Sequence, residues 1–113
     1  MNVTTSRHGN TVVVHVTETR LTYPILSDFA TAVAALLDAG EKQVLVDLST
    51  VSYVDSATIG CLMNLYRQAS DAGGQLKLSG VQKRVETMLT MTGAHNFLEV
   101  HADQASALAS FGG

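Results

Sequence analysis

The sequence predicts one α/β domain: a mostly parallel, mixed β-sheet of about four to five strands with about four α-helices. After an opening pair of strand-like segments, apolar runs of strand length alternate with amphipathic stretches of helical length. That order is typical of right-handed crossover units in a parallel sheet. The length of 113 residues suits one compact domain, so we expect a single domain over residues 1–113.

Turn-forming residues separate the expected elements. His8-Gly9-Asn10 predicts a hairpin turn, Pro24 suits the first turn of a helix, and Gly40 and Gly73-Gly74 predict helix ends. The almost unbroken apolar run at 44–48 is typical of a central strand that is covered on both faces. The expected elements, in order, are strands over 3–7 and 11–16, a helix over 24–39, a strand over 44–48, a helix over 57–72, a strand over 75–78, a helix over 81–91, an edge strand over 97–100 and a short helix over 103–111.

Composition and charge narrow the class of protein. Hydrophobic residues make up 46% of the chain and charged residues 15%, which argues against disorder. The formal net charge of −3 provides no basic surface for nucleic acid or for an anionic membrane, so we expect neither partner. Without an apolar run of membrane-spanning length or a signal sequence, we expect a cytoplasmic protein.

We expect Cys61 to be an inert thiol on an apolar helix face, and Met63, Met88 and Met91 to pack in the core. The terminal residues 112–113 are expected to fray.

The most informative stretch is Val54-Asp55-Ser56-Ala57-Thr58-Ile59-Gly60. It joins a strand signal to a helix signal, so its small hydroxyl residues fall in the first turn of a helix. The backbone N–H groups there lack partners and the helix dipole is positive. In open α/β sheets, working sites lie beyond the carboxyl ends of the strands, where this turn is expected. A hydroxyl at this place either caps the helix or carries a phosphate, and the residues alone leave both open.

The residues around Ser56 argue against a hydrolase site. Ser56 lacks the Gly-x-Ser-x-Gly turn of α/β-hydrolases, and no histidine can be assigned to it as a base. Asp47, inside a strand signal, is expected to bond nearby backbone or to end the ladder of its strand, and Asp55 to cap a helix. We expect no cofactor and no metal, because the histidines lack ligand spacing. These histidines are His8, His15, His95 and His101.

The joint order and spacing of these pieces resemble the STAS domains, and within them the single-domain anti-sigma-factor antagonists. The resemblance rests on Val46-Asp47-Leu48-Ser49, on the stretch from Asp55 to Gly60, on Gly73-Gly74-Gln75-Leu76-Lys77-Leu78 and on residues 85–93, and covers nearly the whole chain. It implies a STAS-type fold and a binding switch. In that family a kinase that is also the anti-sigma factor phosphorylates the serine directly after the aspartate, and Ser56 matches this serine. The unmodified domain binds the kinase and frees a sigma factor; phosphorylation switches binding off, and a serine phosphatase resets it.

The resemblance also implies a docking surface, and two of its positions depart from the family pattern. Thr58 stands where glycine is common; it adds bulk beside Ser56 and a second hydroxyl, so it is the second choice of phosphoacceptor. Thr22 falls near a position that is acidic in many antagonists. The alternative is a STAS subunit of a lipid-transport complex or a scaffold of a larger signalling assembly. The implied docking residues are Thr22, Tyr23, Asp55, Ser56, Ala57 and Thr58.

Overall fold

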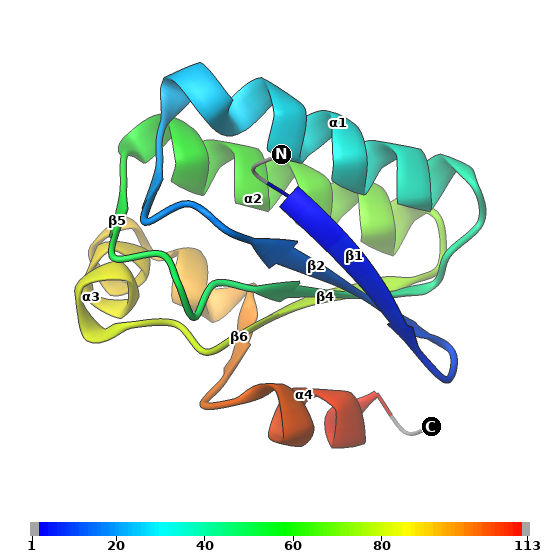
Figure 1. The fold of residues 1–113 in the computed structure, drawn as a ribbon. Coiled ribbons are helices and arrows are strands. Elements are labelled where there is room, and N and C mark those ends of the chain that lie inside the picture. The colour runs from blue at the N-terminus through cyan, green and yellow to red at the C-terminus, as the bar shows by residue number, and fades with distance from the viewer. Residues whose placement is uncertain (1–2, 112–113) are drawn as a thin grey trace.

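A five-stranded mixed sheet forms the centre of the molecule, with its strands in the order β1-β2-β4-β6-β7 (Figure 1). The computed structural model describes residues 3–111; the expected fraying at 112–113 lies outside these residues. β1 pairs antiparallel with β2, and the other neighbours pair in parallel, which confirms the predicted mixed, mostly parallel sheet. The elements are β1 (Val3–His8), β2 (Thr11–Val16), β3 (Arg20–Leu21), α1 (Tyr23–Asp38), β4 (Gln43–Asp47), β5 (Tyr53–Val54), α2 (Ser56–Asp71), β6 (Gln75–Ser79), α3 (Lys83–Thr92), the 3-10 turn η1 (Ala94–Asn96), β7 (Glu99–His101) and α4 (Gln104–Ser110).

The two faces of the sheet are covered unequally. α1 and α2 lie on one face (Figure 1), and together with α3 they share the main core with alternate strand residues such as Val14, Val46 and Leu78. α4 covers part of the other face through a small cluster: Val13, Leu45, Ala107 and Phe111. Both faces of β4 are therefore covered, as the apolar run predicted.

α4 is also held by a buried lysine. Lys77 is only 7% exposed, and its Nζ lies 2.9 Å from both Glu99 Oε2 and Ser110 Oγ. The ammonium also lies 4.6 Å from the centre of the Phe111 ring. A cation placed against the last turn of a helix interacts favourably with its exposed carbonyl groups.

Three features of the fold differ from the sequence-based expectations. The strand expected from residue 97 starts only at Glu99 as β7, because η1 directly precedes it and Phe97 is the C-cap of η1. Phe97 is consequently 57% exposed and packs against the Tyr66 ring. Met91 is 77% exposed, so the expectation that it packs in the core is wrong, whereas Met63 and Met88 are partly buried against the core.

The third difference is a second, two-stranded sheet that the sequence did not reveal. β3 and β5 pair in parallel, with Arg20 opposite Tyr53 and Leu21 opposite Val54. The strand that precedes the Asp55-Ser56 turn is thus β5 and not the central strand β4, which ends at Asp47. This small sheet brings the segment before α1 next to the start of α2.

One glycine is required by a close backbone approach. A Cβ atom on Gly74 would lie 2.7 Å from the carbonyl oxygen of Lys42, closer than real Cβ contacts. The same Lys42 oxygen accepts a hydrogen bond from Gln75 N at 2.7 Å, so the chain must pass close by at this point. Gly74 therefore lets β6 align beside β4 directly after α2 ends.

Within residues 3–111, no helix is long and apolar enough to cross a membrane.

Candidate functional site

The starts of α1 and α2 lie side by side and share one carboxylate. Asp55 is the N-cap of α2, as the sequence predicted, and its Oδ1 accepts a hydrogen bond from Thr58 N at 2.9 Å. Its Oδ2 accepts a hydrogen bond at 3.2 Å from the backbone N–H of Tyr23, the first residue of α1. One side chain therefore satisfies otherwise unpaired N–H groups of two helices.

These contacts keep Asp55 ionised. Burial by itself would raise the pKa of its carboxyl group, but the hydrogen bonds from the Thr58 side chain, the Thr58 N–H and the Tyr23 N–H outweigh burial, and the pKa is lowered. A negative charge at this place also suits the positive end of the α2 dipole.

Thr58 is buried beneath the turn. It is 0% exposed, and its Oγ1 lies 2.7 Å from the carbonyl oxygen of Leu21 and 2.8 Å from Asp55 Oδ1. The one hydroxyl proton can serve either acceptor. Thr58 thus links β3 to the cap of α2, a contact that glycine could not make. It does not add bulk to the surface beside Ser56, contrary to the sequence-based expectation.

Ser56 occupies the first position of α2, and its side chain is exposed. Because Asp55 provides the cap, the Ser56 hydroxyl is not needed for that purpose. Among residues 3–111, no hydrogen bond to this hydroxyl is found. Ala57 beside it is exposed as well. The turn therefore presents a free serine hydroxyl next to small side chains.

An apolar groove runs between α1 and α2 next to this turn. Its volume is about 380 Å³, and its walls include Tyr23, Pro24, Leu26 and Cys61. Tyr23 is 76% exposed at one end of the groove. Cys61 is half-buried in its wall, and burial raises the pKa of its thiol, as expected for an unreactive cysteine.

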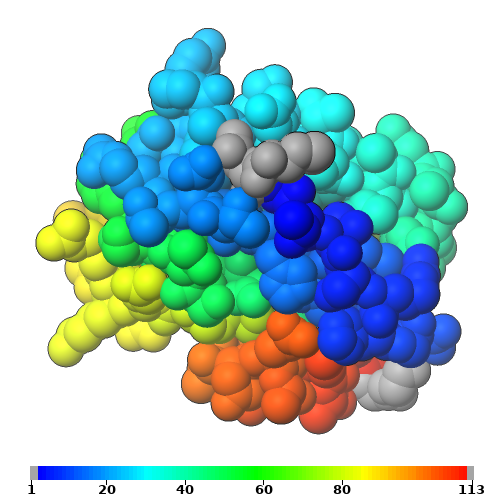
Figure 2. Space-filling model, in the orientation of Figure 1, coloured from blue at the N-terminus to red at the C-terminus, as the bar shows by residue number. Residues whose placement is uncertain are grey.

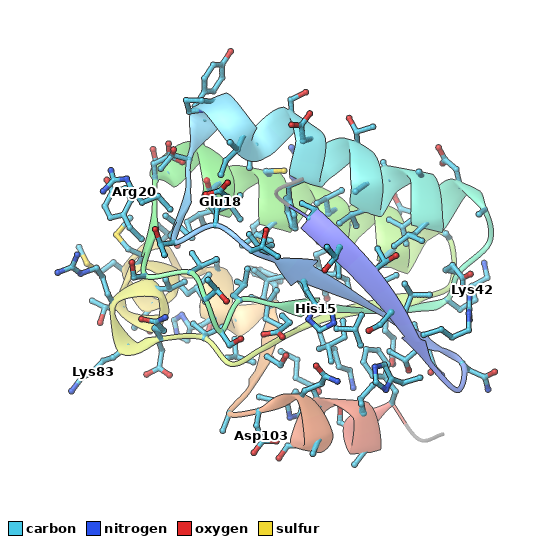
Figure 3. All side chains as sticks on the ribbon, viewed as in Figure 1. His15, Glu18, Arg20, Lys42, Lys83 and Asp103 are labelled. Atoms are coloured by element: carbon cyan, nitrogen blue, oxygen red, sulfur yellow. The ribbon has the colours of Figure 1, made fainter. Side chains whose placement is uncertain are left out.

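The segment before α1 differs in detail from the expected loop. Thr22 is the N-cap of α1 and is partly buried, but its side chain makes no capping hydrogen bond, and Tyr23 already belongs to the helix. Arg20 lies on the same side of the molecule as the start of α2 (Figure 3), and its guanidinium lies 4.4 Å from the centre of the Tyr53 ring. This cation–π contact supports the β3–β5 pair beneath the turn.

A serine, a histidine and an aspartate do meet in this fold, but not at Ser56. His15 Nδ1 lies 3.0 Å from Asp47 Oδ2, and Ser6 Oγ lies 3.0 Å from His15 Nε2. Asp47 Oδ1 also accepts a hydrogen bond from Ser49 N, which confirms the expected backbone contact. The three side chains come from β1, β2 and β4 and link these neighbouring strands. None of them lines the α1–α2 groove or a second groove of about 300 Å³ beside Tyr66 and Phe97.

In the part of the chain that the structure describes, histidine, cysteine and acidic side chains do not gather into a metal site. Among residues 3–111, no group of three or more such side chains is placed to hold a metal ion. His15 and His101 each contact one carboxylate, that of Asp47 and that of Glu99.

Comparison with known proteins identifies relatives of the whole fold. The family model described as "Mlab, STAS domain" matches residues 3–100, a range that contains β1 to η1 and most of β7 but not α4. A protein of Thermotoga neapolitana, whose name assigns it provisionally to the anti-sigma factor antagonists, is 29% identical over 72 residues. The matched stretch is 64% of this chain and 64% of that relative.

Solved structures agree with the fold. An anti-sigma-factor antagonist (STAS) domain protein from Planctomyces limnophilus superposes with a TM-score of 0.89 at 17% identity, covering 98% of each chain. The Bacillus cell fate determinant SpoIIAA in its phosphorylated form superposes with a TM-score of 0.74 at 14% identity, covering 96% of this chain and 97% of that one.

Proposed function

The chain belongs to the STAS domain family, as its sequence resemblance indicated, and we propose that it acts as an anti-sigma factor antagonist controlled by phosphorylation of Ser56. In this proposal the unmodified domain binds a kinase-type anti-sigma factor and frees a sigma factor. Phosphorylation releases the kinase, and a serine phosphatase restores the binding form. The domain itself is a binding protein and not an enzyme.

The observation that carries the proposal is the free, exposed hydroxyl of Ser56 at the first position of α2. A kinase needs an acceptor hydroxyl that it can reach without unfolding the substrate. Ser56 meets this requirement, whereas Thr58 is 0% exposed and its hydroxyl is hydrogen-bonded inside the fold. We therefore propose Ser56, and not Thr58, as the phosphoacceptor. Thr58 has the structural role of linking β3 to α2.

The position of Ser56 explains how a phosphate could change binding and leave the fold intact. A phosphate adds about −1.5 to −2 charge and three acceptor oxygens. At the start of a helix this charge is tolerated by the dipole and the unpaired N–H groups. A partner packed on the turn would have to accommodate and desolvate that charge next to the ionised Asp55.

The neighbouring surface supports a protein partner. Tyr23 and the apolar groove between α1 and α2 adjoin the Ser56 turn, and exposed aromatic side chains beside apolar pockets are typical anchors of interfaces. The proposed docking surface therefore consists of Thr22, Tyr23, Asp55, Ser56 and Ala57. Thr58, which was also expected there, is 0% exposed and cannot contact a partner.

The test is a pull-down with the cognate kinase that compares wild type with Ser56→Ala and Ser56→Asp. We expect Ser56→Ala to bind and Ser56→Asp to lose binding. The matched control is Ser106→Asp, which should bind like wild type. Ser106 is also an exposed serine in the first turn of an aspartate-capped helix, but this helix, α4, lies on the opposite face of the sheet (Figure 1). Equal binding by Ser56→Asp and Ser56→Ala would contradict the switch.

A second measurement identifies the acceptor. Incubation with the kinase and ATP, followed by intact-mass analysis and peptide mapping, is expected to show one phosphate on Ser56. Loss of that phosphate in Ser56→Ala, with Thr58 unmodified, is the expected pattern. A phosphate on Thr58 would require the first turn of α2 to open and would overturn the assignment.

The alternative function is a STAS subunit of a lipid-transport complex; the description of the matching family model, "Mlab, STAS domain", does not itself name a sigma-factor system. The two functions predict different partners. Co-purification with a transporter ATPase or permease, unaffected by Ser56→Asp, would support the transport complex. Co-purification with a histidine-kinase-like ATPase, lost in Ser56→Asp, would support the antagonist.

A further inference from the structure

The two edges of the main sheet differ in how far they are protected from pairing. β7, at one edge, has only three residues, and its Glu99 and His101 side chains contact each other. β1, at the other edge, has six residues and contains neither proline nor lysine. Its one formal charge, Arg7, forms an ion pair with Glu41 of the same chain. Short strands, charges and proline normally protect sheet edges from pairing, and β1 lacks these features over most of its length.

The hairpin determines which backbone groups of β1 point outward. The turn Gly9-Asn10 has φ of +62° at Gly9 and no positive φ at Asn10, which fits a type II′ turn with His8 and Thr11 as the closing pair. Because the closing pair of such a turn is hydrogen-bonded, every second residue from His8 bonds β2. The N–H and C=O groups of Val3, Thr5 and Arg7 therefore point away from the sheet. Figure 2 shows the dark blue atoms of β1 at the surface of the molecule.

We propose that this edge pairs with β1 of a second copy of the chain, antiparallel and about a two-fold axis at Thr5. In that register Thr5 lies opposite Thr5 of the second copy, Val3 lies opposite Arg7, and Thr4 lies opposite Ser6. Opposed threonines are favourable cross-strand neighbours, and no like charges face each other. The register allows about six backbone hydrogen bonds, against about four when the axis lies at Thr4 or Ser6.

The pairing joins two five-stranded sheets into one continuous sheet. A single strand pair is smaller than the interface of about 1,200–2,000 Å² that is usual for stable complexes, so the dimer is weak and depends on concentration. The start of α2 lies away from this edge (Figure 1), so each dimer presents two Ser56 turns. The proposal does not depend on the function of those turns.

Sedimentation equilibrium of the full chain over a range of concentrations tests the proposal. We expect the mass to rise from 12.0 kDa towards twice that value for wild type. Thr5→Pro removes the central outward N–H, which has no role within the chain, and proline is tolerated on an edge strand whose N–H faces solvent. We expect it to raise the dissociation constant at least about tenfold. The control Thr5→Val keeps the N–H group and a β-branched side chain and should dimerise like wild type.

Amide hydrogen exchange provides a readout that does not depend on how well the proline variant folds. In wild type, protection of the Thr5 and Arg7 amides should increase with protein concentration, while that of Ser6, already bonded to β2, should not change. A 12.0 kDa monomer at every concentration, dimerisation of Thr5→Pro equal to that of wild type, or a dimer without added protection at Thr5 would each overturn the proposal.

Discussion

Replacement of Thr58 by valine tests whether the buried hydroxyl links β3 to the start of α2. Valine has nearly the same shape, so the change removes the hydroxyl and leaves the packing in place. The carbonyl oxygen of Leu21, 2.7 Å from Thr58 Oγ1, then loses its hydroxyl donor in a fully buried setting. An unsatisfied buried acceptor and a lost hydrogen bond together cost about 1–3 kcal/mol, so we expect Thr58→Val to lower the free energy of unfolding by that amount.

The same substitution should change the titration of Asp55. The Thr58 hydroxyl lies 2.8 Å from Asp55 Oδ1, and its hydrogen bond contributes to the lowered pKa of that carboxyl group. We therefore expect the pKa of Asp55 to be higher in Thr58→Val than in wild type. Thr58→Ser keeps the hydroxyl and serves as the control: it should lose about 1 kcal/mol for the missing methyl group but leave the Asp55 pKa unchanged.

Urea unfolding followed by circular dichroism gives the stabilities, and NMR titration of the Asp55 carboxyl carbon gives the pKa. The reasoning would be refuted if Thr58→Val unfolded at the same urea concentration as wild type and Asp55 titrated at the same pH. Thr58→Gly, which restores the residue common in the family, should cost more than valine, because glycine also removes the buried methyl group and weakens the helix by about 1 kcal/mol.

Three further outcomes are expected. Asp55→Asn keeps a capping side chain but loses the charge. Because the folded-state pKa of Asp55 lies below its ordinary 3.8, the stability from ionised Asp55 is present above pH 3.8 and is lost as the pH falls through the lower folded-state pKa. On acidification the urea midpoint should therefore fall less in the variant than in wild type. Tyr23→Ala should change the free energy of unfolding by less than about 0.5 kcal/mol because Tyr23 is 76% exposed, yet weaken binding of the proposed kinase partner about tenfold or more. Met91→Ala, at a side chain 77% exposed, is the matched control and should bind normally. Lys77→Met should lower the opening free energy of α4 by about 1–3 kcal/mol, seen as faster amide exchange in α4 with unchanged exchange at the start of α2.

Local sequence patterns predicted the principal elements because each depends on residues close together in the chain. The β-branched run at Thr11–Val16 forms β2 with the predicted bounds, and α2 begins at Ser56, one residue before the predicted start. The aspartate cap was also predictable, since aspartate before a helical signal is a local feature. The Ser56 turn was thus found at the start of a helix, as expected.

Features that depend on distant partners were not predictable. The buried Thr58 hydroxyl lies 2.7 Å from the carbonyl oxygen of Leu21, 37 residues earlier, and nothing near Thr58 in the sequence indicates that contact. The β3–β5 pair consists of two-residue strands, too short to show a period of two. The hydrogen bond from Tyr23 N to Asp55 spans 32 residues and depends on the placement of α1 beside α2.

The shared carboxylate of Asp55 has a mechanical consequence. Its two oxygens hold the first peptide group of α1 and the third of α2, at 3.2 Å and 2.9 Å. The two helix starts therefore cannot slide past each other unless one of these hydrogen bonds breaks or the side chain rotates. A displacement of the Tyr23 backbone is therefore coupled, through the Asp55 side chain, to the peptide group two residues beyond Ser56.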